Sequence, residues 1–263
     1  MLPLDSARHI VTAVVVTHDG ARWLPETLEA LRSQVRPVQR VIGVDTGSRD
    51  RSGAILAEYL NSESILTLPR NTGYGEAIQA ALDHPRSRSG LAGTEGTVEW
   101  IWLIHDDCTP EPDALQQLLA AADDNPRAAV LGPKLRDWFD RRLLVEVGVT
   151  IDGAGRRETG LESSEFDHGQ HDGTRQVLAV SSAGMLIRRD VWEELGGFDR
   201  SLRLFRDDID FCWRVGGAGH RVLIVTEAVA YHAEAAARRR RRIHATGDHP
   251  RRVDRRNALY VLL

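Results

Sequence analysis

Two carboxylates and an imidazole follow an apolar run near the middle of the chain. The run Trp100–Ile104 is followed at once by His105, Asp106 and Asp107. Placing these groups at the end of a buried strand is costly unless a cation lies between them. The alternative is an acidic surface turn, which the apolar run disfavours. Carboxylates favour Mg²⁺ or Mn²⁺, and a nearby histidine shifts the preference toward Mn²⁺. In an extended backbone His105 and Asp107 share one side, so we expect Asp107 to bind the metal and Asp106 to lie near a ribose or behind the metal ligands.

A second acidic group opens an amphipathic segment later in the chain. Asp207, Asp208 and Asp210 occur within four residues. A single aspartate here would cap a helix and interact favourably with its dipole, but three exceed what capping requires. We therefore expect one carboxylate to be free for proton transfer, beside a phosphorylated ligand that the metal holds.

Strand and helix patterns alternate through the first half of the chain. This order predicts an α/β protein with a doubly wound, mostly parallel sheet and helices on both faces. One helix is expected to begin at Pro25, and three more to cover Ser52–Tyr59, Gly75–Leu82 and Asp113–Ala122. The expected strands are His9–Val16, Val38–Val44, Ser64–Leu68, Trp100–Ile104 and Ala128–Leu131.

The alternation is lost after Pro133, and a smaller mixed sheet is expected there. Asp152–Thr174 is polar, acidic and rich in glycine, which predicts a long loop. His84–Thr97 is expected to be a surface loop as well. The expected strands are Leu143–Ile151, Gln176–Val180, Leu186–Arg188, Arg221–Val225 and Val229–Tyr231, and the expected helices are Asp190–Leu195 and Asp207–Gly216.

Polar residues stand at the ends of consecutive predicted strands. Ligands of doubly wound sheets bind at the carboxyl ends of the strands, so these residues should line one crevice. Asp45 could accept a hydrogen bond from a nucleobase, although Asp-x-Gly-Ser is also good turn chemistry. Gly73 could let the backbone approach a phosphate or ribose, or merely allow a turn. The positions are Thr17, Asp45, Asn71 with Gly73, and His105.

The order of these motifs resembles the inverting family 2 glycosyltransferases, whose GT-A fold binds nucleotide sugars. The resemblance covers roughly residues 9–235, and its short motifs are specific in combination. Two positions depart from the family pattern: His105 replaces the first aspartate of Asp-x-Asp, and Asp207 replaces the glutamate of a Glu-Asp pair. The matching segments are Val14–Thr17, Val44–Asp50, Asn71–Gly75, Asp106–Asp107, Gly196–Asp199, Asp207–Arg214 and Tyr231–His232.

The resemblance implies a role for each matched residue. Asp208 would be the catalytic base, with Asp207 beside it. Asp107 would hold Mn²⁺ or Mg²⁺ under the diphosphate, and His232 would be a further metal or diphosphate ligand. By itself, a lone histidine after a strand is more often packed or exposed. The nucleotide-sugar site would comprise Thr17, Asp45, Asn71, Gly73, His105 and Asp106.

Length and composition are those of a soluble globular protein. The 263 residues are 42% hydrophobic and 27% charged, and no apolar stretch approaches the roughly 20 residues of a membrane span. Two cysteines cannot form a disulfide framework, so a cytoplasmic setting is expected. We expect a catalytic domain over residues 1–235, with halves 1–132 and 133–235, and a tail over 236–263.

The charge is concentrated at the end of the chain. Residues 238–263 contain nine arginines and two aspartates, a formal +7 that leaves −11 for residues 1–237. The run Arg238–Arg242 is a solvated basic face or a contact with an anionic membrane surface. Nucleic acid is not expected, because aromatic residues are not interleaved with the basic ones. The apolar ending could also be the start of a longer, membrane-attached protein.

These observations favour an enzyme that acts at the inner face of the plasma membrane. The expected reaction is metal-dependent, inverting transfer of a sugar from a nucleoside-diphosphate sugar to a cell-envelope glycan or lipid-linked acceptor. A nucleotidyltransferase on a similar sheet is the first alternative, but Thr17–Gly20 is not the basic, glycine-rich loop that it would need. A catalytically silent nucleotide-binding or scaffold module is the second.

Overall fold

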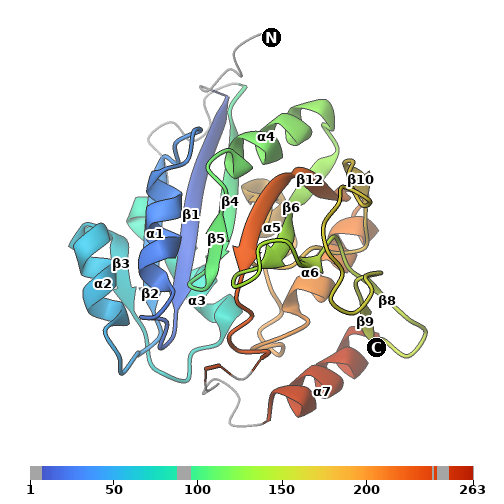
Figure 1. Ribbon diagram of the computed structural model, residues 1–263. Coiled ribbons are helices and arrows are strands. Elements are labelled where there is room, and N and C mark those ends of the chain that lie inside the picture. Colours follow the sequence, from blue (N-terminus) through green and yellow to red (C-terminus); the bar gives the residue numbers. More distant parts are fainter. Residues whose placement is uncertain (1–7, 88–95, 239, 242–248, 263) are drawn as a thin grey trace.

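One mixed sheet forms the centre of the computed structural model, which describes residues 8–87, 96–238, 240–241 and 249–262 (Figure 1). Strand β5 (Cys108–Pro110) pairs with β12, and β7 (Leu144–Glu146) pairs with β6. From one edge the other strands follow in the order β10 (Arg175–Gln176), β12 (Arg221–His232), β6 (Ala128–Asp137), β11 (Leu186–Arg188), β4 (Val98–His105), β1 (His9–Thr17), β2 (Arg40–Asp45) and β3 (Ile65–Thr67).

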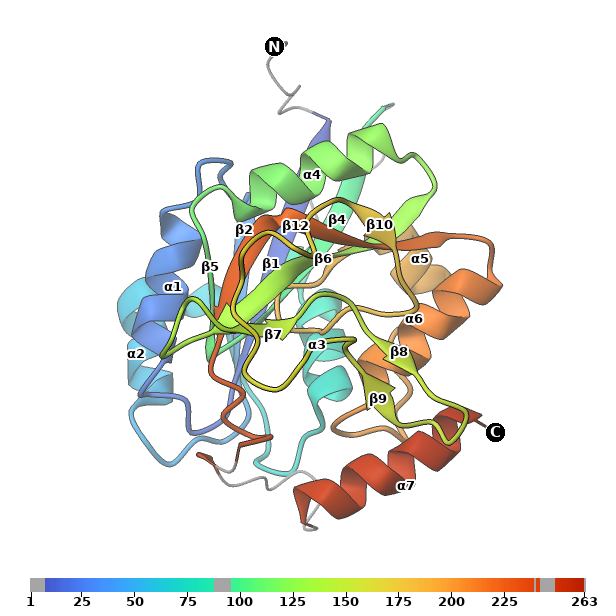
Figure 2. The ribbon, with the colours of Figure 1, turned by 45° about the vertical axis from the view of Figure 1, so that its right-hand side comes forward.

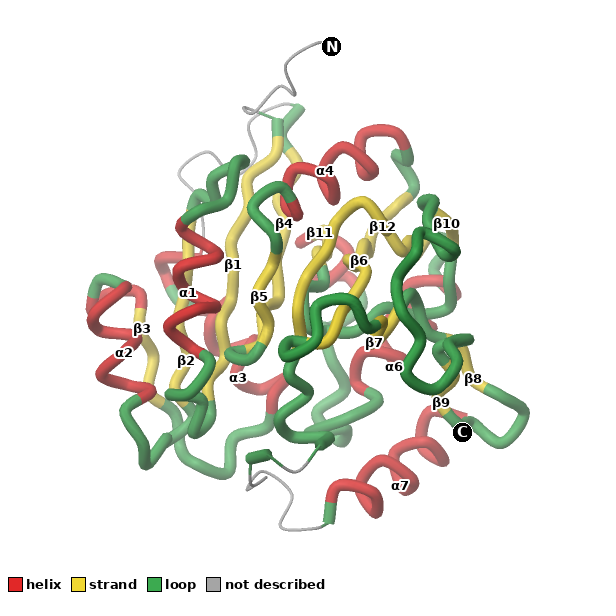
Figure 3. Tube along the Cα trace, viewed as in Figure 1, coloured by secondary structure: helices red, strands yellow, loops and turns green. Residues whose placement is uncertain are grey.

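Helices cover both faces of this sheet (Figure 3). Residues of β1 alternate between two cores: Val11, Ala13 and Val15 face one, and Val14 faces the other. The first core includes α1 (Leu24–Arg32), α2 (Ser52–Tyr59) and α4 (Ala114–Asp124), and the second includes α3 (Tyr74–Asp83), α5 (Arg189–Glu194) and α6 (Asp207–Gly217). The predicted doubly wound, mostly parallel α/β fold is confirmed.

Parallel pairing brings the polar strand ends to one edge. Strand β1 lies between β2 and β4, parallel to both, with Thr17 opposite Asp45 and Val16 opposite His105. The short strand β5 pairs antiparallel with β12, and it sets His232 opposite Cys108. His232 is therefore beside Asp107, which precedes Cys108 in the chain. Sequence analysis did not predict β5, because three residues that include a proline have no strand pattern of their own.

The second half of the chain departs from the parallel pattern. Strand β11 runs antiparallel between β4 and β6. The second sheet is a small antiparallel pair, β8 (Thr150–Ile151) with β9 (Arg157–Glu158). The predicted strand Leu143–Ile151 is broken into β7 and β8 around Gly148, whose φ of 86° suits glycine. A Cβ atom there would lie 2.7 Å from Cγ1 of Val177.

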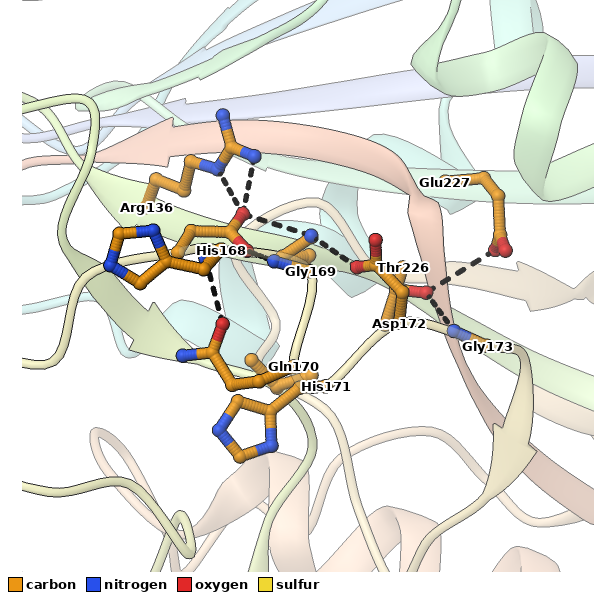
Figure 4. Close-up of polar contacts among 12 residues, drawn as sticks. Arg136, His168, Gly169, Gln170, His171, Asp172, Gly173, Thr226 and Glu227 are labelled. Carbon is orange, nitrogen blue, oxygen red and sulfur yellow. Dashed lines mark hydrogen bonds and ion pairs between the residues drawn. The ribbon is translucent and has the colours of Figure 1, made fainter.

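Most of the predicted loop Asp152–Thr174 is irregular, as expected, but polar contacts hold it against the sheet (Figure 4). Asp167 accepts a hydrogen bond of 2.7 Å from Nε of Arg136 and lies 2.9 Å from Nζ of the buried Lys134. The amide of Gly173 donates to Oγ1 of Thr226 on β12, at 2.7 Å. These contacts fix one end of the segment that carries β9.

The arginine-rich end of the chain contains a helix that was not predicted, α7 (Pro250–Leu262). It lies beside the β8–β9 hairpin in both ribbon views (Figures 1 and 2). No helix among the described residues is long and apolar enough to cross a membrane. Two short 3₁₀ helices complete the structure, η1 (Ser62–Ser64) and η2 (Pro85–Ser87), and most of the predicted loop after η2 lies outside the described residues.

Candidate active site

A cavity of about 490 Å³ opens at the carboxyl ends of the central strands. It joins the two acidic groups that sequence analysis singled out, which lie a hundred positions apart in the chain. The predicted residues that line it are His105, Asp106, Asp107, Asp207, Asp208 and His232. Thr17, Asp45, Asn71 and Gly73 are not among its lining residues, although their neighbours Val16, His18, Thr46, Thr72 and Tyr74 are.

Three of these residues form a group that could hold a metal ion. Ligand atoms of His105, Asp107 and His232 all lie within 4.8 Å of one another. The Oδ2 atom of Asp107 accepts a hydrogen bond of 2.7 Å from the amide of Ala235. Its buried Oδ1 atom has no hydrogen-bond partner among the described residues and lies 3.3 Å from Nε2 of His232. A buried carboxylate oxygen beside two imidazoles fits Mn²⁺. It fits Mg²⁺ less well, because Mg²⁺ prefers oxygen ligands to imidazole nitrogen.

The protonation states of His105 and Asp107 suit metal binding, whereas His232 must lose a proton before it can be a ligand. Burial, together with the charge of His232, lowers the pKa of His105 to about 3, so its imidazole is neutral. Burial opposes ionisation of Asp107, but His232 and Arg241 together outweigh it and hold the pKa of Asp107 well below its usual range. Asp107 in turn raises the pKa of His232 against the effect of burial. A metal ion would displace the proton of His232 and take its place beside Asp107.

Asp106 points to a different set of partners. Its Oδ2 atom accepts hydrogen bonds from Oγ1 of Thr17, at 2.8 Å, and from the amide of His18, at 3.1 Å. A guanidinium nitrogen of Arg241 lies 2.6 Å from each of its carboxylate oxygens. A Cβ atom at Gly20 would lie 2.0 Å from Oδ2, so glycine is required for this close approach. Thr17 thus reaches the cavity through Asp106 and joins β1 to the acidic loop after β4.

Arg241, from the segment that follows His232, also reaches this site. Its side chain is 13% exposed and also donates to the carbonyl oxygen of His18, at 3.1 Å. Arg238 pairs with Asp137 and Glu234. The expectation of a solvated arginine face is therefore wrong for Arg241, because the buried Asp106 draws its guanidinium group inward, whereas Arg238 and Arg240 are exposed. Arg239 and Arg242 lie outside the described residues.

Asp45, Asn71 and Gly73 make the local contacts of turns and caps. Oδ1 of Asp45 accepts the amide hydrogen of Ser48 at 2.9 Å. The carbonyl oxygen of Asn71 accepts a hydrogen bond from Arg203, and the amide of Gly73 donates to Oε2 of Glu76 at 2.7 Å, which caps α3. Their predicted role in nucleotide binding stays a prediction.

The paired aspartates stand at the first turn of α6. Asp207 and Asp208 are only 4% and 5% exposed, although charged groups are seldom buried without partners. The two preceding residues, Phe205 and Arg206, have φ angles of 64° and 70°. The left-handed conformation costs a non-glycine residue about 1–3 kcal/mol and persists only where its surroundings enforce it. The turn that directs the aspartates into the cavity is therefore held by other parts of the structure.

Two residues that sequence analysis did not select complete this acidic end of the cavity. Arg157, from β9, lies 3.1 Å from Oδ2 of Asp208 and also pairs with Glu146. Glu146 accepts a further hydrogen bond of 2.8 Å from the amide of Ser181. Burial on its own would lower the pKa of Arg157, but these two carboxylates raise it above its usual range. Neither residue belongs to a recognisable motif, so no local signal marked them.

Asp207 has a different environment from Asp208. Its buried Oδ2 atom has no hydrogen-bond partner among the described residues. Burial, and then the charge of Asp208, raises the pKa of Asp207 to about 8. Because the folded-state pKa lies above the unfolded one, Asp207 adds stability at acidic pH that is lost as the pH rises toward 8.

Asp207→Asn should remove this pH dependence, because the amide stays neutral. We expect the free energy of unfolding of the wild type to fall relative to the variant by up to about 1.4 kcal/mol per pH unit between pH 5 and 8, and then to level off. Thermal unfolding over this range measures the difference, with Asp113→Asn at an exposed position as the control. A difference that stays constant with pH would contradict the raised pKa.

The chain matches one family model and resembles several known proteins. The family model described as glycosyl transferase family 2 matches residues 12–196. The N-acetylglucosaminyl-diphospho-decaprenol L-rhamnosyltransferase of Mycobacterium tuberculosis is 27% identical over 92% of this chain and 79% of its own length. The O-antigen chain rhamnosyltransferase RfbN of Salmonella typhimurium is 25% identical over 85% of this chain and 66% of its own.

A solved structure supports the same fold. The mannosyltransferase PcManGT of Pyrobaculum calidifontis, in complex with GDP-Man and Mn²⁺, superimposes with a TM-score of 0.61 over 97% of this chain and 70% of its own, at 18% identity. At that identity the likeness concerns the fold alone. The predicted GT-A architecture is thereby confirmed.

Proposed function

The chain belongs to glycosyl transferase family 2, and from that premise we propose that it transfers a sugar from a nucleoside-diphosphate sugar to a lipid-linked or glycan acceptor, with metal dependence and inversion. The observation that carries this proposal is the shared cavity. His105, Asp107 and His232 lie in it as a group that could hold a metal ion, and the buried Asp208 lies in the same cavity at the start of α6. A sugar bound between them would have its diphosphate leaving group at the proposed metal site and the proposed base, Asp208, on its other side.

Asp107 and His232, joined by His105, would hold the metal. When bound, Mn²⁺ or Mg²⁺ neutralises the negative charge that develops on the diphosphate as the glycosidic C–O bond breaks. Asp106 and Thr17 fix the loop that presents Asp107. The positions Asp45, Asn71 and Gly73 form the rest of the proposed nucleotide-sugar site, next to the cavity-lining residues Thr46 and Thr72.

Asp208 would act as the general base. It accepts the proton of the acceptor hydroxyl while that oxygen bonds to the anomeric carbon, and the bonding electrons of the C–O bond leave with the diphosphate. Attack from the side opposite the leaving group inverts the anomeric configuration. Arg157 orients the carboxylate of Asp208 through the contact at 3.1 Å.

A transfer assay tests the proposal. Thermal-shift screening of UDP, GDP, dTDP and their sugars, with and without Mn²⁺, should find a donor that raises the melting temperature in the presence of the metal, since ligand binding stabilises the folded state. That donor, with lipid-linked glycan acceptors, should yield free nucleoside diphosphate and a product of inverted configuration by NMR. Release of pyrophosphate in a separate incubation with a nucleoside triphosphate and a sugar 1-phosphate would instead indicate a nucleotidyltransferase. Binding without turnover on any donor would indicate a silent module.

We place the acceptor at a membrane surface. The named substrate of the Mycobacterium tuberculosis relative is a decaprenol-linked diphosphate sugar. Helix α7 exposes three large apolar side chains, Leu259, Tyr260 and Leu262, which are 62%, 54% and 43% exposed, and Arg252 is exposed on the same helix. A basic, partly apolar helix binds the interface of an anionic bilayer. This supports a cytoplasmic enzyme at the inner face of the plasma membrane, with α7 as a contact in addition to the exposed Arg238 and Arg240, whereas Arg241 is turned inward.

Liposome co-sedimentation should detect this contact. We expect the full chain to bind vesicles rich in anionic phospholipid, to bind neutral vesicles less, and to lose binding as salt screens the arginines. The double variant Leu259→Ser and Tyr260→Ser should bind less at every salt concentration, because it removes apolar contact. Val35→Ser, at an exposed apolar residue elsewhere on the surface, is the control. Equal binding of all three proteins would contradict a membrane contact through α7.

A further inference from the structure

The main-chain carbonyl groups just before α6 accept hydrogen bonds from a side chain on α7. Asn257 is fully buried, and its Nδ2 atom donates to the carbonyl oxygens of Leu204, at 2.8 Å, and Phe205, at 3.0 Å. Leu204 comes just before the two left-handed residues Phe205 and Arg206, and the carbonyl group of Phe205 lies between them. One side chain from the end of the chain therefore satisfies two main-chain acceptors that the turn leaves without helical partners.

A second contact from α7 fixes the turn itself. Asp254 pairs with Arg206 through two hydrogen bonds, of 2.6 Å from Nε and 3.1 Å from Nη2. Arg206 is 5% exposed and has a φ of 70°, and its Nη1 atom donates to the carbonyl oxygen of Gly155 at 2.8 Å. The guanidinium thus joins α7, the turn before α6 and the β8–β9 hairpin.

The hairpin also packs directly on α7. A Cβ atom at Gly155 would lie 2.8 Å from Cδ1 of Leu262 and 3.1 Å from the carbonyl oxygen of Ala258. Gly155 is two residues before Arg157, which contacts Asp208. Both supports of Asp208, the turn before it and the arginine beside it, therefore rest on the same helix (Figure 2).

We propose that α7 is a positioning element for the aspartate pair, with Asn257 and Asp254 as its positioning residues. This inference rests on the proposed function. Without the two donors of Asn257 the left-handed residues Phe205 and Arg206 would relax toward ordinary backbone angles, because nothing else satisfies those carbonyl groups among the described contacts. Asp208 would then turn away from the reacting hydroxyl, while His105, Asp107 and His232 keep their geometry.

The test is a kinetic comparison of two identical substitutions. Asn257→Asp keeps the size but replaces the two donated hydrogens with oxygen. We expect kcat to fall about 10- to 100-fold, as for a small misplacement of a catalytic group, with the donor KM and the affinity for nucleoside diphosphate within about twofold. Asn125→Asp is the matched control, because Nδ2 of Asn125 donates to the carbonyl oxygen of Ala121 at 2.9 Å at the end of α4. It should leave kcat unchanged.

A second pair of variants keeps the test decisive if Asn257→Asp does not fold. Asp254→Asn should lower kcat selectively, and Asp254→Glu should restore most of it by renewing the ion pair with Arg206. Unchanged kcat in folded variants at both positions, or a parallel loss of kcat and nucleotide affinity, would overturn the positioning role. Absence of transfer by the wild type on any donor would instead refute the proposed function, so the two failures are distinct.

Discussion

Asp208→Asn is expected to lower kcat by about 10²- to 10⁴-fold, the contribution usual for a general base. The amide keeps the size of the side chain and can still accept a hydrogen bond from Arg157, so the donor should bind as before. A loss confined to kcat is the signature of an interaction made in the transition state. Steady-state kinetics and calorimetry of nucleotide binding give the two quantities separately.

Asp210→Asn is the control for this prediction. Asp210 belongs to the same turn of α6, but it pairs with Arg214 and is not among the residues that line the cavity. Its replacement should change kcat by less than about twofold, because Asp210 does not face the cavity. Near-normal turnover by Asp208→Asn would remove Asp208 from the mechanism. The same loss in both variants would show that the effect comes from α6 as a whole.

Asp107→Ala is expected to abolish the metal dependence of nucleotide binding while the fold remains. Even residues that only support metal ligands change metal affinity about 10- to 100-fold, so removal of a ligand should cost at least about 100-fold. The carboxylate is also the partner of His232, whose pKa should fall in the variant, because burial lowers that pKa and Asp107 no longer opposes it. Calorimetric titration of nucleoside diphosphate with and without Mn²⁺ measures the loss.

Arg241→Gln is expected to change metal binding in the opposite direction to Asp107→Ala. Its guanidinium lies 3.9 Å from Oδ1 of Asp107 and 2.6 Å from Asp106, so its positive charge opposes a metal cation in the same place. Removing that charge should tighten Mn²⁺ binding in the absence of nucleotide. If Asp107→Ala kept the nucleotide affinity that the wild type has with Mn²⁺, the assignment of Asp107 as a metal ligand would be wrong. Weaker Mn²⁺ binding in Arg241→Gln would show that the arginine supports the metal site.

Much of the fold could be predicted from local patterns. The β-branched run at His9–Val16 indicated a strand buried on both faces, and β1 spans His9–Thr17. Helix α2 begins and ends where the pattern placed it, at Ser52 and Tyr59. Such elements carry their signal in periodicity and turn residues, which neighbouring positions encode. The polar strand ends were predicted to meet for a similar reason, since parallel strands end at one edge.

Only the tertiary structure shows which side chains neutralise the charges of the buried carboxylates. Arg157 and Arg241 reach Asp208 and Asp106 from segments that sequence analysis had read as a loop and a separate tail. Asn257 and Asp254 likewise reach the turn before α6 from the far end of the chain. No periodicity or motif announces such pairs, because an arginine or asparagine has the same local pattern whether it faces water or a carboxylate. What selects the partner is the cost of burying an unpaired charge or carbonyl group, and that cost exists only once the chain has folded around it.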